Sequence, residues 1–200
     1  LRSQAQAGDA PLLGTFWITP EARPSRPELL LTCLHEAYPG HHLQFCHMAG
    51  AASRARRAIG TPLFWEGWAL YAESLLSELD LGELCDEAAR LHVLKARLWR
   101  AARVVLDVGL HCEGLAPEAA VETLVETCGL RRPQAEVEVR RYSRTPTQPL
   151  SYLVGYAALR HLRREAEARP GFRLAAFHGE VLRHGAIPLG YLHERLGAGV

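Results

Sequence analysis

The chain has 200 residues, the size of a single domain, and 48% of them are hydrophobic, as expected for a globular protein with a core. Its formal net charge of +1 gives no basis for binding nucleic acid or an anionic membrane, and it contains no run of about 18 apolar residues that could span a bilayer. The five cysteines are odd in number and lack a Cys-x-x-Cys spacing, which favours reduced thiols and a cytoplasmic protein.

Residues 1–27 are expected to be largely irregular. They contain four prolines and little hydrophobic periodicity, although Gly14–Thr19 could form a short strand. Ser25 and Pro27 are the N-cap and first-turn residues typical of a helix start. We therefore expect at most one short hairpin near the N-terminus, followed by one helical domain over residues 28–200.

The first helix leads into the sequence HEAYPGHHLQ, which places three histidines and one glutamate within eight residues. Neutral imidazole is a good zinc ligand, and a glutamate after the first histidine is the usual general base of a metallopeptidase. We therefore predict that His35 and a second histidine bind zinc, with Glu36 as the base. The proline in this sequence must distort the helix. If the distortion absorbs two residues, His41 lies one turn after His35; if the helix stays regular, almost two turns separate His35 from His42.

A second motif, FWEGWALYAES, follows Thr61 and Pro62, which are typical of a helix start. We expect this helix to extend to about Asp80. Glu66 and Glu73 are seven residues apart and therefore lie on one face, among large apolar side chains. A buried carboxylate is unfavourable unless it is paired or binds a metal. Glu66 is therefore the predicted third ligand, and Glu73 is a candidate to support the site; the alternative is a pair of buried salt bridges.

The rest of the chain shows apolar residues at helical spacing, interrupted by glycine and proline. The longest pattern lacks proline and runs from Glu83 to about His111. Shorter helices are expected at 41–50, 117–127, from 133 onward, and at 150–168, 172–183 and 188–196. The segment TPTQP at 145–149 is expected to be a loop. The predicted fold class is all-α.

The motifs HEAYPGHHLQ and EGWALYAE resemble domain-of-unknown-function family 885, and the likeness extends over nearly the whole chain. That family is similar to zinc peptidases that use two histidines and a downstream glutamate, such as carboxypeptidase Taq and angiotensin-converting enzyme. The resemblance implies a zincin-like helical metallopeptidase half, with zinc held by His35, by His41 or His42, and by Glu66. Family members are usually much longer, so residues 28–200 would be the C-terminal half of a longer architecture.

The same resemblance implies roles for residues in the second half of the chain. By role, the candidates are Tyr142 and His111 for stabilising the oxyanion, Arg141, Gln148 and Tyr152 for binding substrate, and Glu73 and Asp107 for supporting the metal ligands. Family members usually read PGQA where this chain has PTQP at 146–149. This difference affects a loop that could contact the substrate.

We predict a zinc-dependent hydrolase that cleaves peptide or amide bonds in short peptides or amino-acid derivatives. The alternatives are a metal-dependent enzyme of specialised metabolism with non-peptide chemistry, and a non-catalytic interaction module stabilised by a metal. The presence of Glu36 argues against the module, because a purely structural site does not need a base. The wide apolar arcs of helices 62–80 and 83–111 predict a homo-oligomer, or a partner chain that supplies the other half of the cleft.

Overall fold

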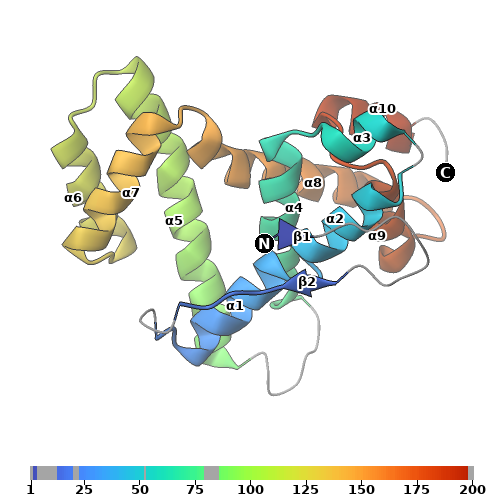
Figure 1. The fold of residues 1–200 in the computed structure, drawn as a ribbon, viewed down its shortest axis with the longest axis horizontal. Coiled ribbons are helices and arrows are strands. Elements are labelled where there is room, and N and C mark those ends of the chain that lie inside the picture. Colours follow the sequence, from blue (N-terminus) through green and yellow to red (C-terminus); the bar gives the residue numbers. More distant parts are fainter. Residues whose placement is uncertain (1, 4–12, 20–22, 52, 79–85, 198–200) are drawn as a thin grey trace.

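The computed structural model describes residues 2–3, 13–19, 23–51, 53–78 and 86–197. Within these ranges the fold is all-α, as predicted, apart from one antiparallel pair of short strands, β1 (Arg2–Ser3) and β2 (Gly14–Thr15). No helix in the described ranges is long and apolar enough to cross a membrane. The helices are α1 (Arg26–Glu36), α2 (His41–Ala49), α3 (Arg54–Ala58), α4 (Pro62–Leu75), α5 (Glu87–Cys112), α6 (Pro117–Cys128), α7 (Arg132–Arg144), α8 (Gln148–Glu167), α9 (Leu174–Arg183) and α10 (Leu189–Gly197) (Figure 1).

Most helix starts follow the local signals in the sequence. Ser25 and Glu28 form a capping box at α1, in which each side chain bonds the backbone N–H of the other residue. The short helix α3 was not predicted, and it buries none of its side chains. The expected helix end at Asp80 and helix start at Glu83 lie outside the described residues.

The helix does not continue through the proline of the first motif. Helix α1 ends at Glu36 and α2 begins at His41, and the chain between them is fixed by the indole N–H of Trp68, which donates to the carbonyl of Pro39 over 2.9 Å. The regular-helix alternative is therefore excluded. The turn places the end of α1 and the start of α2 beside the same stretch of α4.

Helix α4 is the most deeply buried helix, and it crosses α8 with the two backbones in contact. A Cβ atom added to Gly155 would lie 1.9 Å from the carbonyl oxygen of Leu63, and one added to Gly67 would lie 2.5 Å from the carbonyl carbon of Gly155. Only glycine allows this approach. The crossing brings Glu66 on α4 and Tyr152 on α8 into the same region.

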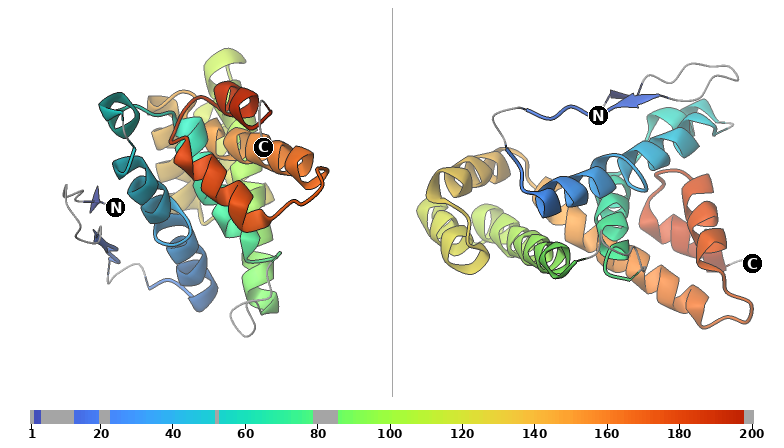
Figure 2. Two further views of the ribbon diagram at one scale, coloured as in Figure 1. Left: turned by 90° about the vertical axis from the view of Figure 1, so that its right-hand side faces the viewer. Right: turned by 90° about the horizontal axis from the view of Figure 1, so that it is seen from below.

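Three apolar clusters surround this region. One joins α4 and α8 with α9 and α10, the second lies within α5, α6 and α7, and the third joins α1 to the start of α5. In Figure 1 the α5–α7 group and the α9–α10 group lie on opposite sides, with α4 and α8 between them. Figure 2 shows the two strands on the outer side of α1 and α2, away from α8. The candidate site lies where these groups meet.

Candidate metal centre

Three side chains from three helices converge at the break between α1 and α2. The Nε2 atoms of His35 and His41 lie 3.7 Å and 3.5 Å from Oε2 of Glu66. The three potential ligand atoms all lie within 4.8 Å of one another. In a tetrahedral zinc site with bonds of about 2.0–2.1 Å, ligand atoms are about 3.3 Å apart. The donor set and its spacing therefore fit zinc, with only small side-chain movements required.

Both histidines are oriented by hydrogen bonds at their other ring nitrogen. Nδ1 of His35 lies 2.7 Å from Oε1 of Glu73, and Nδ1 of His41 lies 3.4 Å from Oε1 of Gln44. Arg100 in turn donates to the same oxygen of Glu73 over 3.0 Å. Because each Nδ1 faces an acceptor oxygen, the neutral rings carry hydrogen there and present the Nε2 lone pair towards Glu66. Such supporting bonds are typical of metal-binding histidines.

The electrostatics of the cluster are those of a tightly coupled acid–base group. Burial lowers the pKa of His35, but the carboxylates of Glu66 and Glu73 more than offset this effect and raise the pKa to about 9. Burial raises the pKa of Glu66, whereas hydrogen bonds from His35 and His41 outweigh it and lower the pKa to about 2. A metal ion bound between these side chains would take the place of the His35 proton, since a ligating nitrogen must be deprotonated.

The structure distinguishes the two histidines that the sequence left open. His41 faces the cluster, whereas His42 lies under β2, where a Cβ atom on Gly14 would be 2.6 Å from its Nδ1. Nε2 of His42 lies 3.6 Å from the Sγ atom of Cys46. His41 is therefore the second histidine of the candidate site, and His42 is not part of it.

A cleft of about 590 Å³ opens beside the cluster, between α1, α5, α8 and the start of α7. His35, Glu36 and Tyr152 line it, together with Arg100 and Arg103. Glu36 is half-buried at the last position of α1, and its carboxylate has no hydrogen-bond or ion-pair partner among the described residues. It is therefore free to act on a bound molecule.

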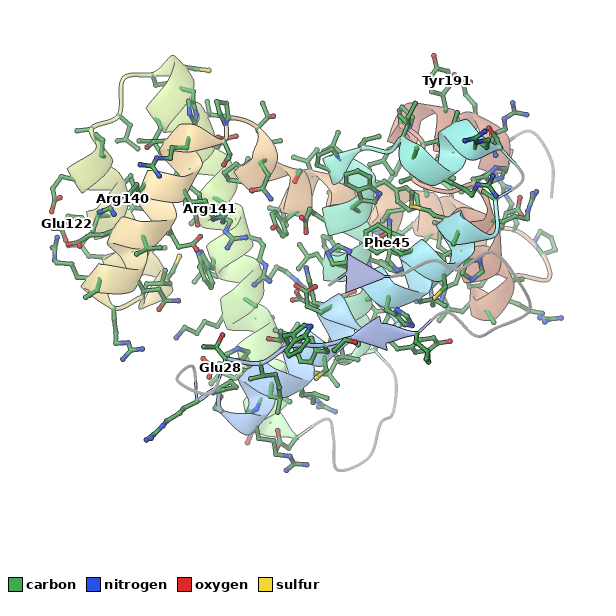
Figure 3. All side chains as sticks on the ribbon, in the orientation of Figure 1. Glu28, Phe45, Glu122, Arg140, Arg141 and Tyr191 are labelled. Carbon is green, nitrogen blue, oxygen red and sulfur yellow. The ribbon has the colours of Figure 1, made fainter. Side chains whose placement is uncertain are left out.

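Tyr152 is the tyrosine that lies at the cluster. Its ring stacks on His35 at a centroid distance of 6.3 Å and an interplanar angle of 20°. Arg141, labelled on α7 in Figure 3, donates over 2.8 Å to Oε1 of Gln148, and Nε2 of Gln148 lies 3.1 Å from the hydroxyl oxygen of Tyr152. Burial raises the pKa of Tyr152, and the carboxylate of Glu66 raises it further. Arg141 and Gln148 thus support Tyr152 and do not line the cleft within the described residues.

The predicted catalytic role of Tyr142 does not agree with its position. Its side chain is fully buried in the α5–α7 cluster, and its hydroxyl oxygen accepts hydrogen bonds from Trp99 and Arg103 over 3.1 Å and 2.9 Å. A phenol enclosed in this way cannot reach a substrate carbonyl. The sequence pattern does not distinguish the buried tyrosine from the one at the cluster.

Asp107 and His111 are also outside the cluster. Nδ1 of His111 lies 2.8 Å from the carbonyl oxygen of Asp107, and the Asp107 carboxylate accepts from the backbone N–H of Thr147 over 3.0 Å. Neither side chain is among the described residues that line the cleft. Asp107 holds the loop between α7 and α8, and His111 contacts Asp107; among the described residues, neither forms a hydrogen bond or ion pair with a residue of the candidate metal centre.

Three residues that support the site were not singled out from the sequence. They are Gln44, which bonds His41, Arg100, which bonds Glu73, and Arg103, whose guanidinium lies 5.0 Å from the ring centroid of Tyr152. Gln44 follows His41 by three positions on one helix, a spacing that brings side chains together and is visible in the sequence. The arginines lie on a helix far along the chain, so only the tertiary fold reveals them.

Comparisons with known proteins place the chain among bacterial proteins without an assigned activity. Residues 3–196 match a family described as "Bacterial protein of unknown function (DUF885)". The chain is similar to the crystal structure of a candidate lipoprotein from Colwellia psychrerythraea, with a TM-score of 0.82 and 36% identity over 89% of this chain and 31% of that one. It is also similar to a candidate lipoprotein of unknown function from Shewanella oneidensis, with a TM-score of 0.78 and 28% identity over 84% of this chain and 31% of that one. No curated protein matches the chain. It thus spans about a third of each of these solved structures.

Proposed function

We propose a function from the site itself, because the chain belongs to the DUF885 family, and the function of that family is unknown. The proposed function is zinc-dependent hydrolysis of peptide or amide bonds in short peptides or amino-acid derivatives. The observation that carries the proposal is the convergence of His35 Nε2 and His41 Nε2 on one oxygen of Glu66, at 3.7 Å and 3.5 Å, with both Nδ1 atoms held from behind.

Two imidazoles and one carboxylate are the ligand set of several catalytic zinc sites, in which the fourth position is left for water or substrate. When bound, zinc would lower the pKa of a water molecule towards about 7 and would polarise the carbonyl group to be attacked. The remaining tasks belong to side chains of this chain. These are transfer of a proton, stabilisation of the oxyanion and binding of the substrate in the cleft.

Glu36 is the proposed general base. It directly follows the ligand His35, lines the same cleft and has a carboxylate without a partner among the described residues. Its carboxylate would accept a proton from the attacking water and then donate it to the leaving amine.

Tyr152 is the proposed donor to the oxyanion, in place of Tyr142. The guanidinium of Arg141 has only donors, so it fixes the Gln148 side chain with its oxygen towards Arg141 and its NH₂ group towards Tyr152. The phenol oxygen therefore accepts from Gln148, and its own hydrogen remains available. A phenol that is kept protonated by its raised pKa can donate this hydrogen to a developing negative charge.

Zinc binding tests the ligand assignment, and His41→Ala and His42→Ala are the matched pair of variants. The chain purified without chelator should contain one tightly held zinc ion. His41→Ala and Glu66→Gln should lose this ion, whereas His42→Ala should retain it, because His42 lies under β2. Zinc content is measured by mass spectrometry for each variant after dialysis. Equal loss in His41→Ala and His42→Ala would contradict the assignment.

Hydrolysis tests the role of Glu36. Glu36→Gln should keep zinc and reduce kcat by about 10²–10⁴-fold on peptide or amide substrates, because an amide cannot accept the proton. Glu136→Gln is the matched control, since it makes the same change at an exposed position on α7. A zinc-loaded wild-type chain that cleaves none of a broad panel of peptides and aminoacyl amides would refute the proposed function for this chain.

The cellular location is also a proposal. The sequence favours the cytoplasm, whereas both solved relatives are described as candidate lipoproteins. We infer that this protein acts either as a soluble enzyme or at a membrane surface through a lipid anchor. Fractionation of cells that express the complete gene will distinguish the two.

A further inference from the structure

A second group of two histidines and one glutamate lies on the surface, on α8 and α10. Nε2 of His193 on α10 lies 3.0 Å from Oε2 of Glu165 on α8, and Nε2 of His161 lies 3.5 Å from Oε1 of the same glutamate. The rings of His161 and His193 stack at a centroid distance of 6.3 Å and an interplanar angle of 26°. One potential ligand atom from each of the three side chains lies within 4.8 Å of the others.

The arrangement has the properties of an open metal site. His161 and Glu165 are four positions apart on one helix, a spacing that directs both side chains to the same side. The two Nε2 atoms lie 3.0 Å and 3.5 Å from different oxygens of Glu165, and the separation expected between two ligand atoms of a tetrahedral zinc ion is about 3.3 Å. Small rotations of these exposed side chains would bring both imidazoles and one carboxylate oxygen around one ion. All three side chains are at least 40% exposed, so water can complete the coordination.

We propose that His161, Glu165 and His193 form a second binding site for a divalent transition-metal ion such as Zn²⁺. Imidazole and carboxylate ligands suit zinc, nickel and copper, and do not suit magnesium or calcium, which prefer oxygen ligands alone. This site is exposed, whereas the candidate metal centre is largely buried, and the two sites also differ in the hydrogen bonds that orient their histidines. Among the described residues, no further side chain holds the Nδ1 atoms of His161 and His193, whereas His35 and His41 are both supported.

A metal ion at this site would join α10 to α8. Helix α10 contacts the rest of the chain through the buried side chains of Leu192 and Leu196, and through a hydrogen bond of 2.9 Å from Arg169 to the carbonyl of Leu196. Glu165 and His193 also line a cavity of about 290 Å³ between α8, α9 and α10. The ion would therefore fix one wall of this cavity.

In tight metal sites the second ring nitrogen of each histidine is held by a hydrogen bond, and losing such a bond lowers metal affinity by about 10–100-fold. The surface site lacks these bonds among the described residues. It should therefore bind zinc at least that much more weakly than the candidate metal centre. Binding to the folded chain alone should also stabilise it.

Equilibrium dialysis of the untagged full chain against Zn²⁺ tests the proposal. Wild type should bind two equivalents, one of them weakly, whereas His161→Gln and His193→Gln should lose only the weak equivalent. Glu194→Gln, next to His193 but not facing the cluster, should still bind two. If the candidate metal centre fails to bind zinc, wild type would show one weak equivalent that is lost in His193→Gln, so the two proposals fail separately.

Hydrogen exchange of α10 provides the second measurement. Zn²⁺ should slow exchange of the amides of residues 189–197 in wild type and in Glu194→Gln. It should have no effect in His161→Gln, whose substitution lies on α8 at an exposed position, removes only the ring stacking on His193 and leaves the buried side chains of Leu192 and Leu196 in place. Full zinc binding in both histidine variants, or unchanged exchange in wild type at saturating Zn²⁺, would overturn the proposal.

Discussion

At the scale of single residues, the central point is that hydrogen bonds between side chains determine which atoms face the cleft. Arg141 sets the orientation of Gln148, and Gln148 sets the direction in which the hydroxyl hydrogen of Tyr152 is available. Glu73 and Gln44 do the same for the two histidines. The proposed chemistry of the site thus depends on residues that need not touch the proposed substrate.

Tyr152→Phe tests this conclusion. It should lower kcat by about 10²–10³-fold, the usual effect of removing one donor to an oxyanion, while zinc content stays unchanged. Tyr156→Phe, one turn further along α8, is the control and should have full activity. If Tyr152→Phe is fully active whereas Tyr142→Phe is not, the sequence-based choice of Tyr142 would be correct.

The sequence predicted that His35, Glu36 and Glu66 belong to the site because their residue types and spacing along the chain are those of a metal site. It could not decide between His41 and His42, since the outcome depends on how the backbone turns at Pro39. It also assigned the oxyanion-stabilising role to Tyr142 and not to Tyr152. The sequence does not reveal that the Tyr142 hydroxyl is buried, because its hydrogen-bond partners, such as Trp99, are distant along the chain.

At the scale of elements, the loop between α7 and α8 contains a residue with a strained backbone. Thr147 precedes α8 with φ of 70°, in the left-handed region that disfavours β-branched side chains. The carboxylate of Asp107 accepts from its backbone N–H over 3.0 Å and 3.3 Å. This is the position at which the PGQA pattern has glycine, so the departure from that pattern falls on a residue whose backbone favours glycine.

Thr147→Gly should therefore stabilise the chain, by about 1 kcal/mol, because it removes the strain of a side chain at positive φ. Chemical denaturation would show this as a higher midpoint with an unchanged slope. Thr145→Gly is the matched control: its φ is −132°, and its hydroxyl donates to the carbonyl of Arg141 over 2.9 Å, so the substitution should give no gain. A midpoint that does not rise in Thr147→Gly would contradict the strain argument.

Helix positions were largely readable from the sequence, because capping residues, proline and glycine act locally. Gly129, for example, ends α6 in the left-handed conformation. Helix α3 was missed because the expected signal is a buried apolar face, and Arg54–Ala58 has none. The sequence also gave no indication that α4 and α8 cross at two glycines.

At the scale of the whole molecule, one face of α5 is apolar and uncovered. Leu91, Leu94, Leu98, Val105 and Val108 are between 39% and 68% exposed. With Ala101 included between Leu98 and Val105, these residues are spaced alternately three and four positions apart. This is the spacing with which one helix packs along another.

We propose that the isolated chain self-associates through this face of α5. Light scattering should give a mass of at least two chains, and Leu98→Glu should give a monomer, because it places a charge in the middle of the seam. Tyr191→Glu is the control, since it adds the same charge at a residue that is 62% exposed on α10, labelled in Figure 3. A monodisperse wild-type monomer with full activity would show that the cleft needs neither a second copy nor a partner chain.

The contact between Gly67 and Gly155 has a consequence for identifying relatives that share the candidate site. Neither glycine contributes a functional group, yet Gly67 directly follows Glu66, and Gly155 lies on the same helix as Tyr152. A methyl group on either one would force α4 and α8 apart. Under the proposed function, a relative that retains His35, His41, Glu36 and Glu66 but carries alanine at one of these positions should be inactive, because Glu66 and Tyr152 would be displaced from each other. Under the proposed function, a genome survey that selects only the residues of the candidate metal centre would count such relatives as enzymes.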